Sequence, residues 1–213
     1  MAAHMKQPLT LPEYERIFRT IHGVLLNEES TPEKACLYFA LIGAFMLEKH
    51  HRKTATFRAG AAAYNLRTPT NAVLVLGTIE DGSLVSTESA FHCWIEVDDW
   101  IIDLAAPLFN DMIDPGRTGQ LIKPHMFQKR ASRLGSLDEL NIPGTFHHMP
   151  NPNIQDLLVR HFRSFQANAD LANICVEWYR PPPKKVQHFI EITDQHGSPS
   201  RASHSPVRVT GAW

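Results

Sequence analysis

Apolar positions in the first part of the chain follow helical spacing. After Thr10, apolar residues recur at every third or fourth position, at Tyr14, Ile17, Phe18, Ile21, Val24 and Leu25. The segment TLPE that begins at Thr10 is a capping-box pattern, in which the threonine and glutamate side chains satisfy free amides at a helix start. We therefore expect an amphipathic helix after Thr10.

A second capping-box pattern, STPE, begins at Ser30, with Pro32 early in the turn. The residues that follow, CLYFALIGAFMLEKH, are apolar on nearly all sides, so the helix they form must be buried. Their apolar stretch, residues 35–47, is much shorter than the roughly 20 residues that span a bilayer. The pattern predicts a central buried helix rather than a membrane span.

Beyond this helix the pattern changes to short extended segments. These are ATFRAGAAAYNL, AVLVLGTI, FHCWIEV and WIIDLAAPLF, and turn sequences such as TPTN, EDGS and DD separate them. We expect an antiparallel meander. Together with the central helix it predicts an α+β fold in which a buried helix packs on an antiparallel β-sheet.

The second half of the chain is less regular. Residues 110–153 are rich in proline and glycine, which predicts a long irregular excursion that could wall a cleft, with a short helix near residues 136–140. Helical spacing returns over residues 153–169, and NICVEWYR and VQHFIEIT are interpreted as two further strands. The polar, Ser- and Pro-rich end predicts one domain over residues 1–195 and a mobile tail over residues 196–213.

Composition and charge make some classes of function less favoured, nucleic-acid and membrane binding among them. A chain of 213 residues can bury one continuous core, and its formal net charge of -1 offers no general attraction to nucleic acid or anionic lipid. The N-terminus shows no secretory signal pattern. The three cysteines are scattered and lack CxxC spacing, which disfavours a disulfide framework and favours a reducing, cytoplasmic setting.

The segment FHCWIEVDDWIIDLAAP predicts a hairpin that carries chemistry. If Asp98 and Asp99 form a two-residue loop, Val97 faces Trp100, and facing residues lie on the same side of a sheet. One face then carries His92, Trp94, Glu96, Ile101, Asp103 and Ala105, while the other is apolar and packs. A three-residue loop without a bulge would instead place Asp103 on the wrong face.

In this register Asp103 is the diagonal neighbour of His92, within reach of its ring N–H, and Ala105 opposite the ring leaves it room. A buried carboxylate in this position fixes the imidazole tautomer and stabilises the imidazolium. Cys36 lies in the first turns of the buried helix, where the helix dipole and a nearby imidazolium favour the reactive thiolate. The three residues together predict nucleophilic catalysis by a Cys-His-Asp triad.

This order of motifs resembles a known superfamily. A cysteine at the start of an apolar helix, HCWIEV 56 residues later and an aspartate 11 residues after the histidine are similar to the core of the papain-like superfamily, in its transglutaminase-like and arylamine-acyltransferase branches. The resemblance covers residues 30–107, and the whole sequence also resembles an uncharacterised bacterial family grouped with that fold. It implies that Cys36 is the nucleophile, His92 the base and Asp103 the residue that orients the base.

Two features of the predicted site are less defined. The backbone N–H of Cys36 is the one oxyanion donor that we can propose, because no counterpart of the superfamily's Gln or aromatic donor is evident. Trp94 is a candidate substrate-binding residue, although a tryptophan beside a buried histidine more often packs. A lone cysteine in an apolar helix is likewise more often a core residue.

The predicted function is therefore hydrolysis or acyl transfer on an amide, ester or thioester of a small molecule or peptide, without a cofactor. One alternative is an inactive binding or scaffold module of the same fold, in which Cys36 is sealed from solvent. Another is a metal-dependent hydrolase that uses some of the histidines, namely His50, His51, His125, His147, His148 and His161, although no HExxH motif is present. The sequence leaves the oligomeric state open.

Overall fold

The computed structural model describes residues 6–68, 70–113, 122–194 and 196–213. The first predicted helix is present as α1, Leu11–Asn27, and Thr10 and Glu13 form the predicted capping box, with the N–H of Thr10 2.7 Å from Oε2 of Glu13. The second predicted helix is present as α2, Cys36–His51.

The start of α2 differs from its prediction. The STPE segment does not cap the helix, because a 3₁₀ turn at Pro32–Lys34 comes first and the hydroxyl of Ser30 donates to the carbonyl of Leu25. Ala35 occupies the N-cap position of α2, and its side chain makes no capping hydrogen bond. Cys36 is therefore the first residue of a helix whose N-terminal amides have no side-chain cap.

The main sheet has six strands, and all of its strand pairings are antiparallel. The strands are β1 (Ala55–Asn65), β2 (Val73–Leu76), β5 (His92–Val97), β6 (Trp100–Asp103), β7 (Phe127–Arg130) and β8 (Phe146–Pro150). Their order is β2-β1-β5-β6-β7, and β8 also pairs with β1. The meander prediction is correct for the β1–β2 and β5–β6 pairs but wrong in placing β2 beside β5, because β1 lies between them. Strands β3 (Thr78–Glu80) and β4 (Ser83–Val85) form a separate hairpin.

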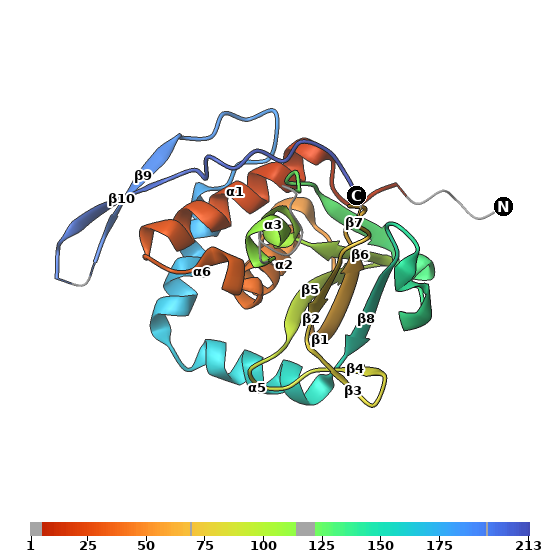
Figure 1. The fold of residues 1–213 in the computed structure, drawn as a ribbon. Coiled ribbons are helices and arrows are strands. Elements are labelled where there is room, and N and C mark those ends of the chain that lie inside the picture. Colours follow the sequence, from red (N-terminus) through yellow and green to blue (C-terminus); the bar gives the residue numbers. More distant parts are fainter. Residues whose placement is uncertain (1–5, 69, 114–121, 195) are drawn as a thin grey trace.

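The two faces of the sheet pack in different clusters. Figure 1 shows α1, α2 and α6 (Gln166–Trp178) on one side of the sheet. Cys93, Ile95 and Val97 of β5 face these helices, while Trp94 joins a cluster on the opposite side. The alternation predicted for the hairpin is therefore present, and α2 lies between the sheet and the other helices, where its all-round apolar surface is buried.

The region that was predicted to be irregular contributes to the main sheet through β7 and β8, and residues 114–121 of it lie outside the described residues. Two short helices, Ala106–Leu108 and α3 (Phe109–Met112), follow β6, and 3₁₀ turns lie at Ala131–Arg133 and Leu137–Asn141. The second of these turns matches the short helix expected near residues 136–140. The sheet strands were missed because each is short and flanked by proline or glycine.

The helix predicted over residues 153–169 is present as α5, Pro152–Arg163, but it ends earlier than predicted, and residues 166–169 belong to α6. The strand predicted for NICVEWYR is wrong, since these residues continue α6, whose partly or fully buried positions Leu171, Ile174, Cys175 and Trp178 follow helical spacing. The strand predicted for VQHFIEIT is present as β9, Phe189–Thr193.

The C-terminal segment differs from the predicted mobile tail. Residues Pro199–Ser203 form β10, which pairs with β9 and lies against α1. Ser205 is buried, and its carbonyl accepts a hydrogen bond of 2.7 Å from Nε of Arg19. The polar composition gave no sign of this packing, in which the hydrogen bonds are joined by the buried side chains of Ala202 and Val209, members of the same apolar cluster as α1.

Close contact at Gly23 makes the docking of this segment testable. A Cβ at Gly23 would lie 2.2 Å from the backbone oxygen of Ser203, so we expect Gly23→Ala to displace β10. The clash outweighs the helix propensity that alanine gains, and the protein should lose on the order of 1 kcal/mol in unfolding free energy. Limited proteolysis should cut near β10 faster than in the wild type. Gly211→Ala is the control, because its Cβ would meet only ordinary contacts at 3.6 Å, and equal effects of the two changes would contradict the docking.

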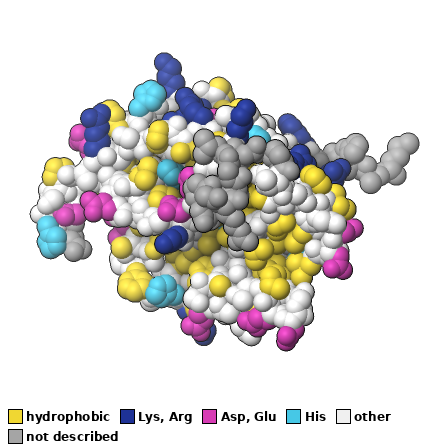
Figure 2. All heavy atoms as spheres, viewed as in Figure 1, with side chains coloured by type: hydrophobic (Ala, Val, Ile, Leu, Met, Phe, Trp, Pro, Cys, Tyr) yellow, Lys and Arg dark blue, Asp and Glu magenta, His cyan; other side chains and the backbone are white. Residues whose placement is uncertain are grey.

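Among the described residues, no helix combines the length and the apolar character that crossing a bilayer requires. Apolar side chains nevertheless reach the surface on the lower half of the face shown in Figure 2. Exposed large apolar residues include Val73 and Val75 on β2 and Ile79 on β3.

Candidate functional site

Three structural elements meet at the residues predicted for the triad. Cys36 is the first residue of α2, His92 the first of β5 and Asp103 the last of β6. All three are buried, with relative exposures of 7%, 1% and 0%. The structure thus brings together three side chains that are far apart in the sequence.

The hairpin has the predicted register, with Val97 opposite Trp100. Asp98 adopts a left-handed φ of 53°, a conformation that aspartate tolerates better than most residues. Asp103 therefore lies on the same side of the sheet as His92, and its Oδ2 is 2.7 Å from Nε2 of His92. The predicted His92–Asp103 contact is present.

The prediction for Ala105 is wrong. Strand β6 ends at Asp103, so the alternation does not continue, and Ala105 packs in the cluster on the helix side of the sheet. Its backbone N–H instead donates to Oδ1 of Asp103 at 2.9 Å. The turn after β6 thus holds the carboxylate in place.

Asp103 receives further hydrogen bonds. The hydroxyl of Tyr64 donates to Oδ2 of Asp103 at 2.7 Å, and the hydroxyl of Tyr14 donates to its backbone carbonyl. Burial by itself raises the pKa of Asp103, but the positive charge and hydrogen bond of His92 and the hydrogen bond of Tyr64 outweigh it, and the pKa is lowered. Asp103 is therefore a carboxylate, and both of its oxygens accept hydrogen bonds.

His92 has the environment of a stabilised imidazolium. Burial lowers the pKa of His92, but the charge and hydrogen bond of Asp103, followed by the interactions with Cys36, raise it to about 10. Because Nε2 is bonded to Asp103, Nδ1 is the ring nitrogen left to interact with the Cys36 sulfur. His92 thus bridges the carboxylate and the thiol.

Cys36 is favoured as a thiolate. A hydrogen bond from the Cys93 thiol has the largest effect and lowers the pKa of Cys36, burial raises it, and the hydrogen bond and charge of His92 lower it further, to about 5. Burial raises the pKa of Cys93, so this neighbour stays a protonated donor. The two shifts therefore favour a thiolate–imidazolium pair at neutral pH.

Four residues of this site were not predicted. Cys93 was assigned to a face that only packs, yet it contacts Cys36, while Tyr14, Tyr64 and His148 come from α1, β1 and β8. The alternation pattern did place Cys93 toward the buried helix, and this was the signal that could have identified it. No sequence pattern indicated that Tyr64 of β1 would reach Asp103, or that His148 of β8, considered only as a metal ligand, would reach Tyr64.

Trp94 occupies a packing position. Its side chain is 1% exposed, its ring centroid lies 4.4 Å from that of His148, and its indole N–H donates to Glu96 at 3.4 Å. It therefore offers no surface for the substrate contact for which it was a candidate.

The histidines considered as metal ligands are directed to different partners. His50 contacts the carbonyl of Val176, His51 the hydroxyl of Tyr179, and His147 the carbonyl of Gly135. In the described part of the chain, no group of three or more His, Cys, Asp or Glu side chains is arranged to hold a metal ion.

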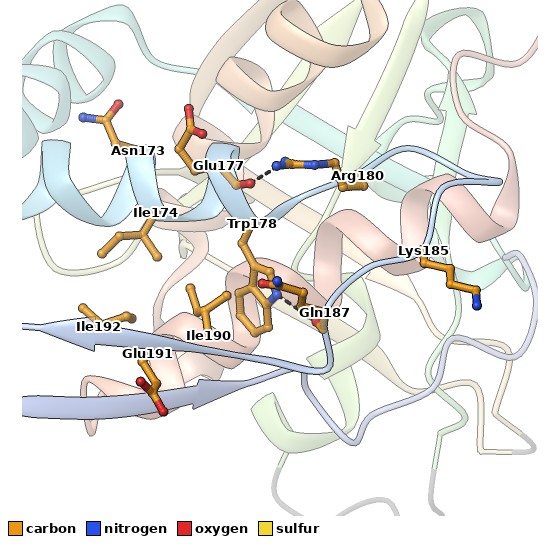
Figure 3. Close-up of a pocket in the computed structure, with 10 residues that line it drawn as sticks. All are labelled: Asn173, Ile174, Glu177, Trp178, Arg180, Lys185, Gln187, Ile190, Glu191 and Ile192. Atoms are coloured by element: carbon orange, nitrogen blue, oxygen red, sulfur yellow. Dashed lines mark hydrogen bonds between the residues drawn. The ribbon is translucent and has the colours of Figure 1, made fainter.

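A separate cavity of about 560 Å³ lies between α6 and β9. In Figure 3, Ile190 and Ile192 of β9 point toward Ile174 and Trp178 of α6, and these side chains form its apolar lining. The indole N–H of Trp178 is already bonded to the carbonyl of Gln187 at 2.9 Å. The cavity contains none of the triad residues.

A family model and a solved structure each match nearly the whole chain or all of it. A family model described as "Protein of unknown function (DUF2026)" matches residues 10–213. A solved structure described as "The crystal structure of genomics APC5867" is 27% identical, covers 100% of both chains and superposes with a TM-score of 0.85. No curated protein matches the chain.

Proposed function

The chain belongs to the DUF2026 family of unknown function, and we propose that it is a thiol-dependent hydrolase or acyl-transfer enzyme. Cys36 is the nucleophile, His92 the acid and base, and Asp103 the residue that orients His92. The single observation that supports this best is the buried bond of 2.7 Å between Asp103 and Nε2 of His92, which leaves Nδ1 as the ring nitrogen available to Cys36. We also propose that the fold is papain- or transglutaminase-like, since the nucleophile starts a central helix and its partners lie on an antiparallel sheet.

In the first half of the reaction the Cys36 sulfur attacks the carbonyl carbon of an amide, ester or thioester. The N–H of Cys36 faces no acceptor within α2, as for any first residue of a helix, and donates to the oxyanion that forms. His92 then gives its Nδ1 proton to the leaving amine, alcohol or thiol. The products are an acyl-enzyme thioester and a neutral imidazole.

In the second half, water or an amine attacks the thioester carbonyl while His92 accepts its proton at Nδ1. The carbon–sulfur bond breaks, and the thiolate–imidazolium pair is restored. Asp103 keeps its charge throughout and holds Nε2 of the ring. The substrate class is a small-molecule or peptide acyl compound, and three free, buried cysteines suit the reducing, cytoplasmic setting that we propose.

The second candidate function is an inactive binding or scaffold module of the same fold. The observation that favours it is burial, because Cys36 is 7% exposed and His92 is 1% exposed. A substrate carbonyl must reach the sulfur for catalysis, whereas a scaffold needs no such access. Reactivity of the thiol separates these two functions.

We expect iodoacetamide to alkylate Cys36 at pH 6, where an ordinary cysteine with a pKa of about 8.5 is almost fully protonated. Because the pKa of Cys36 is lowered to about 5, its alkylation rate should rise through about pH 5 and then stay level through neutral pH. Peptide mapping by mass spectrometry identifies the labelled residue. Cys175 is the internal control, since burial raises its pKa, and it should remain unlabelled.

Turnover is tested on a panel of amide, ester and thioester substrates with the wild type and Cys36→Ala. The variant should lose all activity above background because it lacks the nucleophile. Equal turnover by the two proteins would remove the thiol from the mechanism. An unreactive Cys36 together with no turnover on any substrate would favour the scaffold module.

A further inference from the structure

A buried chain of polar side chains continues beyond Asp103 onto two other strands. The hydroxyl of Tyr64, on β1, lies 2.7 Å from Oδ2 of Asp103, and Nε2 of His148, on β8, lies 2.9 Å from the same hydroxyl. Both side chains are buried. The reaction steps proposed above use neither residue.

The direction of each hydrogen bond follows from the groups involved. The Asp103 carboxylate can only accept, so the one hydroxyl proton of Tyr64 points to it. The Tyr64 oxygen must then accept from Nε2–H of His148. Burial, followed by the positive charge of His92, lowers the pKa of His148 to about 3, so its ring is neutral and carries its proton on Nε2. His148 therefore donates to Tyr64, and Tyr64 donates to Asp103.

Aromatic packing holds the Tyr64 hydroxyl in one place. The Tyr64 ring meets the rings of His92, Phe127 and His148 edge to face, with centroid distances of 6.0, 5.1 and 5.3 Å. Oδ2 of Asp103 thus lies between two fixed donors, His92 and Tyr64. With His92 alone as its donor, Oδ2 could turn away from the ring or take up a proton more readily.

We infer that Tyr64 and His148 are positioning residues of this site: Tyr64 anchors Oδ2 of Asp103 beside His92, and His148 fixes the direction of the Tyr64 hydroxyl. The inference rests on the proposed function, because it assigns their role through the Cys36–His92–Asp103 triad. The other groups that face Asp103 bond to different atoms, Tyr14 to its backbone carbonyl and the Ala105 N–H to Oδ1. Tyr64 is therefore the second side-chain donor to Oδ2.

Tyr64→Phe tests the anchor because it keeps the ring and removes only the hydroxyl. Loss of a charge-assisted hydrogen bond raises the pKa of Asp103, and protonated Asp103 no longer holds His92 as an imidazolium. The acid limb of Cys36 alkylation should move to higher pH by about one pKa unit, the worth of such a bond, and the rate at pH 5 should then fall about fivefold. NMR titration of the His92 ring nitrogens should show their acid-side transition, which reports the protonation of Asp103, move to higher pH as well, without any substrate.

Variants of His148 test the direction of the two hydrogen bonds that link His148, Tyr64 and Asp103. His148→Leu should shift the profile in the same direction by less, because the Tyr64 hydroxyl stays but can rotate. His148→Gln supplies an N–H donor and should restore the wild-type profile. Tyr38→Phe is the matched control, since it removes a tyrosine hydroxyl that is bonded to Asn168 of α6 at 2.9 Å rather than to Asp103, and it should leave the profile unchanged.

The possible outcomes separate the inference from the proposed function. A lower melting temperature in Tyr64→Phe with an unchanged alkylation profile and an unchanged His92 titration would give Tyr64 a merely structural role and overturn the inference. Full turnover by Cys36→Ala would overturn the proposed function instead, and the His92 titration would still report whether Tyr64 acts on the Asp103–His92 pair.

Discussion

Asp103→Asn is expected to lower kcat/KM by roughly 1,000- to 10,000-fold, the range seen when the carboxylate of a catalytic triad is replaced by an amide. The amide has no charge to hold the His92 imidazolium, and its NH₂ group can face Nε2 and force the proton onto Nδ1. The Cys36 sulfur then loses its imidazolium partner and is largely a thiol at neutral pH. Steady-state kinetics with the substrate found in the acyl panel measure this loss.

Asp99→Asn is the matched control for this change. Asp99 lies on the same hairpin and pairs with Arg130 at its surface, so its replacement should change kcat/KM by less than about twofold. Alkylation of Cys36 at pH 6 should be slow in Asp103→Asn and normal in Asp99→Asn. Wild-type turnover by a folded Asp103→Asn protein would show that the carboxylate only stabilises the structure.

Trp94→Ala is expected to have the largest effect on stability. The indole is 1% exposed, is among the largest fully buried side chains and packs against His148. Removing a buried tryptophan leaves a cavity and costs about 3–5 kcal/mol, a large share of the stability of a typical domain. Urea denaturation followed by circular dichroism measures the change in unfolding free energy.

Phe165→Ala serves as the control because Phe165 is 54% exposed and should change the unfolding free energy by less than about 0.5 kcal/mol. Kinetics on the folded fraction of Trp94→Ala separate packing from substrate binding. A packing residue leaves KM near the wild-type value, whereas a large rise in KM with little loss of stability would restore the substrate role that the sequence allowed.

Local patterns predicted the core of the candidate site. The parity of the β5–β6 hairpin placed Asp103 beside His92, and the all-round apolar segment after Cys36 predicted the buried helix. Both depend on residues that are close in sequence, where strand alternation and helix periodicity apply directly. To predict the contact between Cys36 and His92, one also had to assume that this helix packs on the sheet.

The rest of the site depends on long-range strand pairing that the sequence does not encode locally. Tyr64 reaches Asp103 because β1 pairs with β5, and His148 reaches Tyr64 because β8 pairs with β1. The meander prediction paired segments that are neighbours in the sequence. It therefore left out the β1–β5 pairing that brings Tyr64 to Asp103. His148 lies in a segment interrupted by Pro143, Gly144 and Pro150, where a short strand has no clear alternation signal.

The start of α2 lacks the side-chain cap that would make this helix more stable. A serine or aspartate in place of Ala35 would add about 1 kcal/mol to a typical protein by occupying free amides of the first turn. In this protein those amides surround the proposed nucleophile, so a stabilising cap would compete with the reaction intermediate. The start of α2 is thus a position where gains in thermal tolerance and in catalytic rate would oppose each other.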